Sequence, residues 1–153
     1  MELVFKRHQF YPSIESVPEN KRKLFGLASK YIVKIKFKGK EAWDTNTYGF
    51  LSDSGAFVSY APEALLESLD IPVEFESYIR GIAPNDACKV KVKFAKTLLK
   101  IIDDEGTESR ELSAWFAFHP YKSPLLLGMK DIILEENGRC VQNSTYIAWK
   151  EYF

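Results

Sequence analysis

The 153-residue sequence has few of the residues that build metal sites and disulfide networks, and it has no long apolar run. It contains two cysteines, Cys88 and Cys140, and two histidines, His8 and His119, which show no close ligand spacing. We therefore expect no metal site, no cofactor and no disulfide framework, and structural roles for these four side chains. No stretch approaches the roughly 20 apolar residues of a transmembrane helix, and residues 1–10 lack the order of a signal peptide. These absences predict a soluble, cytoplasmic protein without a membrane partner.

Net charge is absent as well. The 21 Lys and Arg residues balance the 21 Asp and Glu residues, so the formal charge at pH 7 is zero and gives no reason to expect nucleic acid as a partner. Two lysine-rich stretches, residues 34–40 and 89–94, leave a basic β-barrel that binds nucleic acid as an alternative. Alternating lysines are more typical of the solvated face of a strand. A Gly-x-Ser-x-Gly motif and a glycine-rich phosphate loop are both missing, which disfavours serine hydrolases and nucleotide enzymes.

The elements that the sequence does predict are mostly strands. Residues 31–38 alternate between lysines and the apolar Val33, Ile35 and Phe37, which is typical of a strand with one wet face. Pro62 to Leu69 is predicted as a short helix. Residues 73–94 indicate a hairpin with its tip near Gly81 to Asp86. Other predicted strands are 3–5, 96–102, 112–119 and a C-terminal segment within 139–152, with a second short helix over 128–138. About seven strands, two short helices and no β-α-β rhythm favour an all-β barrel or sandwich.

One acid stands in unusual surroundings. In "GFLSDSGAFVS", residues 49–59, Asp53 is followed by Ser54 and Gly55, with apolar residues on both sides. Asp-Ser-Gly is ordinary turn chemistry, because Asp and Ser hydrogen-bond their own backbone and Gly adopts positive φ freely. A buried carboxylate is costly unless it is paired or shared. Asp53 is therefore either a turn-capping residue or a functional one. A second Asp-Thr pair at Asp44 lacks the glycine and is predicted to be a loop.

The stretch from Phe50 to Ala56 resembles the apolar-apolar-x-Asp-Thr/Ser-Gly-Ala signature of the retropepsin-like aspartic proteases. A proline-headed helix follows it, the hairpin around residues 78–87 falls where that family carries its flap, and residues 123–133 resemble the family's later apolar-apolar-Gly motif. The resemblance implies a closed β-barrel with a flap hairpin and one or two short helices over residues 30–153. Residues 1–29 would then be an N-terminal extension of uncertain role. Gly128 would let its strand pass close beneath the catalytic turn.

The resemblance also implies an aspartic endopeptidase without a cofactor. One acid motif per chain requires a homodimer, in which Asp53 and its copy share a proton, the known behaviour of aspartic protease dyads. Ser54 would hydrogen-bond across the dimer axis, and Gly55 would permit the tight turn. A peptide or protein substrate would lie between the turn and the flap. The implied substrate contacts are Ala56, Tyr78, Ile79, Arg80, Gly81, Ile82, Ala83 and Leu126.

The sequence departs from the family pattern at a few positions. Ser52 stands where the family usually has a bulky apolar residue, and the flap tip has few glycines. Phe57 and Met129 occupy the places of an Asp and an Arg that form an ion pair in retroviral members, so we expect apolar packing there instead. Ser52 and the flap keep open a second alternative, a retropepsin-like dimerisation or peptide-binding module without catalysis.

Overall fold

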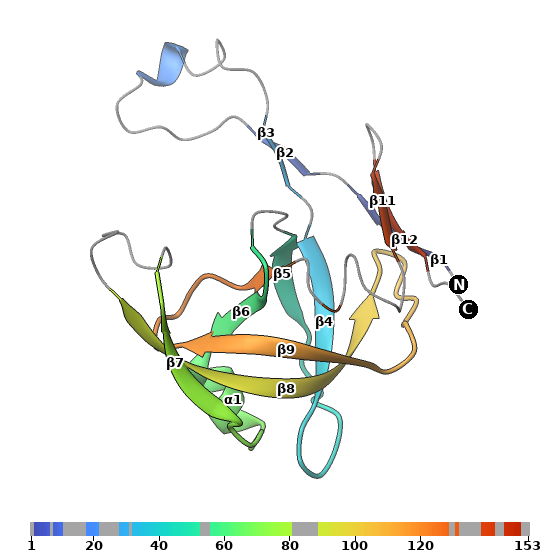
Figure 1. Cartoon of the computed structure of the whole chain (residues 1–153). Helices are drawn as coiled ribbons and strands as arrows, with labels where there is room; N and C mark the ends of the chain where they lie inside the picture. Colours follow the sequence, from blue (N-terminus) through green and yellow to red (C-terminus); the bar gives the residue numbers. More distant parts are fainter. Residues whose placement is uncertain are drawn as a thin grey trace.

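The computed structural model describes residues 2–6, 8–10, 18–21, 28–30, 32–52, 56–80, 89–128, 131, 139–142 and 146–150. Most of these residues lie in β-strands, as Figure 1 shows, so the prediction of a mostly β fold is confirmed. Seven strands form the main sheet: β4 (Ile32–Lys38), β5 (Tyr48–Ser52), β6 (Ser59–Pro62), β7 (Phe75–Ile79), β8 (Val90–Ile102), β9 (Leu112–His119) and β10 (Leu126–Leu127).

The strand pairings of this sheet run in a ring. The order is β4-β5-β10-β6-β9-β8-β7, and β8 also pairs antiparallel with β4, from Lys34 opposite Ile102 to Lys38 opposite Leu98. Six strands are therefore linked in a closed series of pairings, while β7 is attached outside the ring through β8. The long β8 both closes the ring and holds β7, because its two ends have different neighbours: β7 pairs with one end and β4 with the other.

Two predicted strands turn out to be one. Residues 89–94 and 96–102 were expected to form separate strands, but β8 runs unbroken through both for 13 residues. Its middle is held by β9, which pairs with it from Lys93 to Leu99. Antiparallel pairing along this length keeps the strand continuous, and no turn residue interrupts it. The predictions for β4 and β9 are confirmed, and in β4 the residues Val33, Ile35 and Phe37 are buried as expected.

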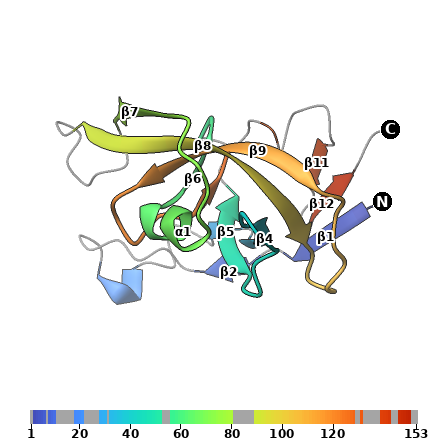
Figure 2. The ribbon, with the colours of Figure 1, turned by 90° about the horizontal axis from the view of Figure 1, so that it is seen from below.

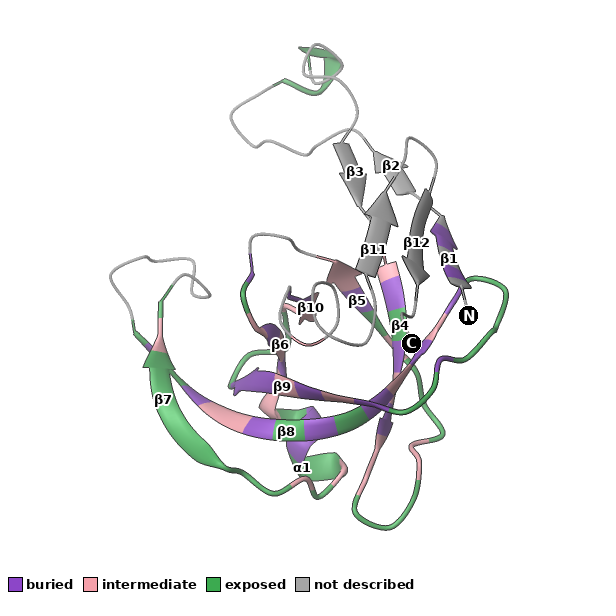
Figure 3. Cartoon of the chain, turned by 45° about the vertical axis from the view of Figure 1, so that its right-hand side comes forward, coloured by how far each residue is buried: buried purple, intermediate pink, exposed green. Residues whose placement is uncertain are grey.

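The main core lies on one face of the ring. Phe37, Phe50 and Phe116 pack edge to face there, with ring centroids 5.4–5.9 Å apart, a favourable geometry for aromatic pairs. Figure 3 shows buried positions along β4, β8 and β9. Leu3 and Phe5 are buried in the same core, although they come from the N-terminal strand β1 (Glu2–Lys6).

The first and last strands of the described chain form a second sheet. β1 pairs with β12 (Tyr146–Lys150), which pairs in turn with β11 (Arg139–Gln142). Two short strands, β2 (His8–Phe10) and β3 (Ala28–Lys30), pair with each other outside the seven-stranded sheet (Figure 1). The described chain thus has more strands than the roughly seven expected, because the additional strands have only two to five residues and show little periodic pattern.

The single described α-helix, α1 (Glu63–Ser68), confirms the helix predicted from Pro62 to Leu69. Pro62 precedes its first turn with a φ of −64°, a value suited to a helix start. Leu65 and Leu66 are buried in the main core, and the helix packs beside β6 and β9 (Figure 2). The second predicted helix, over 128–138, lies mostly outside the described residues and stays a prediction.

Candidate functional site

The candidate site lies where β10 is inserted between β5 and β6. β10 is parallel to β5, with Leu127 opposite Ser52, and antiparallel to β6, with Leu126 opposite Tyr60. β5 and β6 are nevertheless consecutive in the sequence. The chain that joins Ser52 to Ser59 connects strands on either side of β10, and its described part, residues 56–58, lies against the end of β10. This connection is the segment that contains the Asp-Ser-Gly triplet.

Gly128 follows β10 at this crossing. A Cβ atom there would lie 2.3 Å from the carbonyl oxygen of Val58 and 2.9 Å from that of Ala56, closer than real Cβ atoms come to backbone. The Gly128 N–H also donates a hydrogen bond of 3.0 Å to Oγ of Ser59, which is fully buried. Position 128 therefore requires glycine, because the backbone of residues 56–58 comes too close for a side chain. The predicted close approach of Gly128 is confirmed for these residues, which directly follow the triplet.

Replacing Ser59 with Ala tests this contact. The variant would leave the buried Gly128 N–H without its acceptor, so we expect the free energy of unfolding to fall by about 1–3 kcal/mol. Urea denaturation followed by circular dichroism measures the change. Ser77→Ala, at an exposed position of β7, serves as the control and should change stability by less than about 0.5 kcal/mol. Equal stability of the two variants would contradict the role assigned to Ser59.

Asp131, close after Gly128 in the later motif, connects the chain beyond the crossing to the sheet. One of its carboxylate oxygens accepts a hydrogen bond of 2.8 Å from the backbone N–H of Trp115 in β9. Asp131 has a φ of 71°, in the left-handed region that Asp tolerates better than most residues. The polar residue of the motif thus holds the chain after Gly128 against β9.

Six predicted site residues lie outside the described residues: Asp53, Ser54, Gly55, Gly81, Ile82 and Ala83. The residues on either side of these gaps are described. Ala56 is buried at 8% exposure, whereas its neighbour Phe57 is 72% exposed. Met129, the other position of the expected apolar packing, lies outside the described residues, so that packing stays a prediction.

The hairpin predicted to be a flap is present as two paired strands. β7 and β8 are antiparallel, from Phe75 opposite Phe94 to Ile79 opposite Val90, so residues 80–89 connect them. Ile79 is half-buried, whereas Tyr78 is 62% exposed. Since successive side chains of a strand point to opposite faces, these two predicted contact residues lie on different faces of the hairpin. Arg80 is exposed directly after β7.

Sequence reasoning missed a small apolar cluster at the base of this hairpin, here called the flap-base cluster. At one end of β8, Val90 and Val92 are buried on one face of the strand; at the other end, Leu99 and Ile101 are buried on the opposite face. Leu99 and Ile101 belong to the main core, so the flap-base cluster lies on the other face of the sheet. The lysine alternation in residues 89–94 indicates a shared face for the two valines without showing what packs on it. The cluster consists of Val90, Val92, Ala117, Val58, Tyr60, Ile79 and Phe94.

The flap-base cluster links the hairpin to the segment after the triplet. Val58 and Tyr60 follow the triplet in sequence, and Ile79 ends the first strand of the hairpin. Leu126, another predicted contact, is half-buried in β10 and lies opposite Tyr60. Ile79, Tyr60 and Leu126 are thus brought to one region of the sheet, beside the connection that carries Asp53.

Ion pairs connect the base of the hairpin to its surroundings. Lys91 of β8 pairs with Glu76 of β7 at 2.9 Å, and Lys93 pairs with Glu63 of α1. The hydrogen bond between Lys91 and Glu76 lowers the pKa of Glu76 and raises that of Lys91. A hydrogen bond to Glu63 likewise raises the pKa of Lys93. Glu76, Lys91 and Lys93 are therefore held in their charged forms at neutral pH.

Most lysines of the two lysine-rich stretches lie beside acidic side chains. Besides the pairs of β8, Lys36 and Lys100 approach Glu108, and Lys38 approaches Glu111, at 3.4–3.6 Å. A nucleic-acid groove needs lysines whose charge is available to phosphates. Acidic partners beside these lysines weigh against the nucleic-acid alternative.

His119 has a structural role, as expected. It is fully buried, with Nε2 2.7 Å from the carbonyl oxygen of Pro124, while Nδ1 accepts a 3.3 Å hydrogen bond from the N–H of Tyr121. These partners assign the proton of the neutral ring to Nε2. Within the described ranges, no group of three or more His, Cys, Asp or Glu side chains could hold a metal ion. Cys88 lies outside those ranges.

The rival acid, Asp44, is in a loop between β4 and β5, as predicted. Its carboxylate accepts hydrogen bonds from the N–H of Asn46 at 3.1 Å and from the hydroxyl of Tyr48 at 2.7 Å. Burial, followed by this hydrogen bond, raises the pKa of Tyr48. Asp44 thus stabilises the loop that leads into β5.

Comparison with known proteins adds little to this geometry. No model of a protein family and no curated protein matches the sequence. Among solved structures, a retropepsin-like aspartic protease from Rickettsia conorii is similar over 97% of this chain and 90% of its own, with 14% identity and a TM-score of 0.47. A likeness of this degree carries no argument about the site. Among the described helices, none is long and apolar enough to cross a membrane.

Proposed function

We propose that this chain is a retropepsin-like aspartic endopeptidase. The observation that carries the proposal is the insertion of β10 between β5 and β6, the two strands between which Asp53-Ser54-Gly55 occurs in the sequence. Gly128 and Ser59 hold the described residues that follow the triplet against the end of β10, which supports this proposal. In this proposal the ring of six strands is the closed barrel of the enzyme, and residues 30–153 are its domain.

The proposed chemistry requires two copies of the chain. Asp53 and the partner subunit's Asp53 would face each other across the dimer axis and share one proton, because two carboxylates at short range cannot both ionise. The ionised carboxylate would take a proton from the attacking water while the protonated one donates to the carbonyl oxygen of the peptide bond. Ser54 would hydrogen-bond across the axis, and Gly55 would allow the close turn.

The β7–β8 hairpin is proposed to be the flap. An extended substrate would pair with the backbone of residues 78–83 as an added strand, and closure would exclude water from the dyad. Ala56 and Leu126 would contact the substrate from the barrel side. The flap-base cluster and the pairs Lys91–Glu76 and Lys93–Glu63 support a firm base about which the tip could close.

Digestion of a mixed peptide library tests the proposed activity. The purified protein is incubated with the library at several pH values from acidic to neutral, and new peptide termini are identified by mass spectrometry. We expect cleavage between residues within the peptides, as an endopeptidase requires. Absence of cleavage at every pH would overturn the proposal. If peptides still bound under those conditions, the non-catalytic module would be favoured instead, for which Ser52, half-buried at the end of β5, is the motivating residue.

Phe57 provides a separate test of the proposed homodimer. This ring follows the triplet closely, and it is the most exposed of the large apolar side chains that the structure describes. A dimer axis at Asp53 would bring the partner subunit near it, so Phe57→Asp should lower the dimer population by placing a charge in an apolar contact. Analytical ultracentrifugation measures the dissociation constant, which we expect to rise at least about tenfold, or about 1.4 kcal/mol.

Phe75→Asp is the matched control for this test. Phe75 is also exposed, at 52%, but lies on β7, where it stacks on Phe94 with ring centroids 4.7 Å apart. It should leave the dimer unchanged. Similar dimerisation of the two variants would contradict an interface at Phe57.

A further inference from the structure

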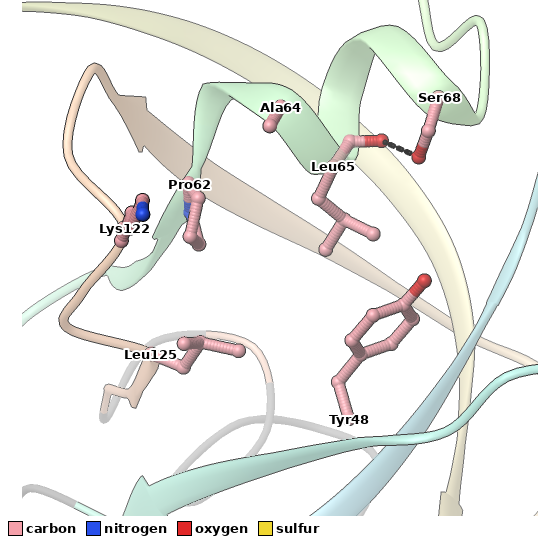
Figure 4. A pocket seen from close by; sticks show the side chains of 7 residues that line it. All are labelled: Tyr48, Pro62, Ala64, Leu65, Ser68, Lys122 and Leu125. Atoms are coloured by element: carbon pink, nitrogen blue, oxygen red, sulfur yellow. Dashed lines mark hydrogen bonds between the residues drawn. The ribbon is translucent and has the colours of Figure 1, made fainter.

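A pocket of about 390 Å³ opens between α1, the start of β5 and the chain that leads into β10 (Figure 4). Its wall is mainly apolar and is formed by Pro62, Leu65, Leu125 and the ring of Tyr48. These side chains come from three separate parts of the fold and converge on one space, as the close-up shows. The volume lies within the range of pockets that bind small molecules.

The polar groups around the pocket differ in whether their hydrogen-bond donors are already used within the protein. The hydroxyl hydrogen of Tyr48 is donated to Asp44, at 2.7 Å, and that of Ser68 to the carbonyl oxygen of Leu65, at 3.0 Å. Lys122 is the one charged residue of the lining, and it forms no ion pair with the described residues. The pocket thus combines an apolar wall with the ammonium group of Lys122, which is paired with no described acid.

We propose that this pocket binds a small molecule made of a compact apolar body and one carboxylate. The apolar body would cover the wall and remove apolar surface from water, which favours binding. The carboxylate would pair with the ammonium group of Lys122. An amine of the same shape would meet a like charge, and an alcohol would leave Lys122 without a counter-ion.

The pocket is separate from the proposed catalytic site but touches the same strands. Tyr48 begins β5 and Ser52 ends it, so the pocket lies about 13 Å along the strand from the end that leads to the triplet. Leu125, which lines the pocket, directly precedes β10, and its carbonyl oxygen accepts a hydrogen bond of 2.9 Å from the N–H of Leu51. A ligand held against Leu125 would stabilise this contact between β5 and the chain entering β10, whether or not the protein cleaves peptides.

Three probes of equal shape test the proposal: 4-phenylbutyrate, 4-phenyl-1-butanol and 4-phenylbutylamine. Calorimetric titration of the full chain should show the acid binding about five- to tenfold more tightly than the alcohol, and the amine most weakly. Hydrogen exchange at the Leu51 amide should slow when the acid is bound. Equal affinity for acid and amine, or no binding of the acid, would overturn the proposal.

Two variants locate the binding. Lys122→Met keeps the length of the side chain without its charge and should reduce the affinity for 4-phenylbutyrate to that of the alcohol. Lys96→Met, which removes an exposed lysine outside the pocket, is the charge-matched control and should bind like wild type. Ala64→Trp should fill the pocket and prevent binding of all three probes. Unchanged affinity in Lys122→Met would overturn the proposal even if Ala64→Trp failed to fold.

Discussion

Replacing Asp53 with Asn is expected to lower kcat/KM for peptide hydrolysis by about a thousandfold or more, with the fold and the oligomeric state unchanged. Asn has nearly the same shape as Asp but cannot take up or release the proton at neutral or acidic pH, and general acid–base catalysis contributes roughly 10²–10⁴-fold. In a homodimer the substitution removes both members of the dyad at once. The rate is measured on a peptide that the library digestion identifies, and circular dichroism and ultracentrifugation check fold and assembly.

Asp44→Asn is the matched control for this experiment. Asp44 also stands in an Asp-Thr pair, but its carboxylate stabilises a loop through Asn46 and Tyr48. Its replacement should leave turnover within about twofold of wild type and reduce stability by about 1 kcal/mol. Retained hydrolysis in Asp53→Asn, or an equal loss in both variants, would refute the assignment of Asp53.

Gly128→Ala is expected to lower the free energy of unfolding by about 3 kcal/mol, a large effect for the addition of one methyl group. The new Cβ would lie 2.3 Å from the carbonyl oxygen and 2.5 Å from the carbonyl carbon of Val58. Both atoms belong to backbone next to a buried residue, so neither can move aside cheaply. Because Ala56 would also be displaced, we expect peptide hydrolysis to be lost even where the variant is still folded.

Gly49→Ala provides the comparison. Its Cβ would meet only a side-chain methyl group of Ile32, at 3.0 Å, which can shift by rotation of the side chain. We expect a loss below about 1 kcal/mol in urea denaturation. If Gly128→Ala were as stable as Gly49→Ala, the close crossing of β10 and the connection above it would be wrong.

Local elements were predictable where a periodic pattern is long enough. The alternation of Val33, Ile35 and Phe37 predicts β4, and the leucines after Pro62 predict α1, because burial of one face follows from spacing alone. The pattern could not show that β8 is a single strand, since its two ends bury opposite faces. The two-residue β10 has no periodic signal at all, although the whole site is arranged around it.

The candidate site was predictable in its residue types and less so in its geometry. The acid triplet and Gly128 could be singled out from sequence, and the close approach at Gly128 is confirmed. Ser59 was not singled out, because a serine in a strand gives no sign that it accepts a buried N–H from a residue far along the chain. Nor could the sequence show that Ile79 faces the flap-base cluster while Tyr78 faces solvent, because this depends on which residues pack against the hairpin.

By itself the sequence determined a mostly β chain, a hairpin over residues 73–94 and an Asp-Ser-Gly triplet within an apolar stretch. These features follow from side-chain alternation, turn residues and composition, which are local properties. Only the tertiary structure decided that β10 lies between two strands that are neighbours in sequence, and that Gly128 lies against the segment after the triplet. Such a crossing depends on contacts between distant residues, because Leu127 reaches Ser52, and Gly128 reaches Ser59, only when the ring of strands has formed.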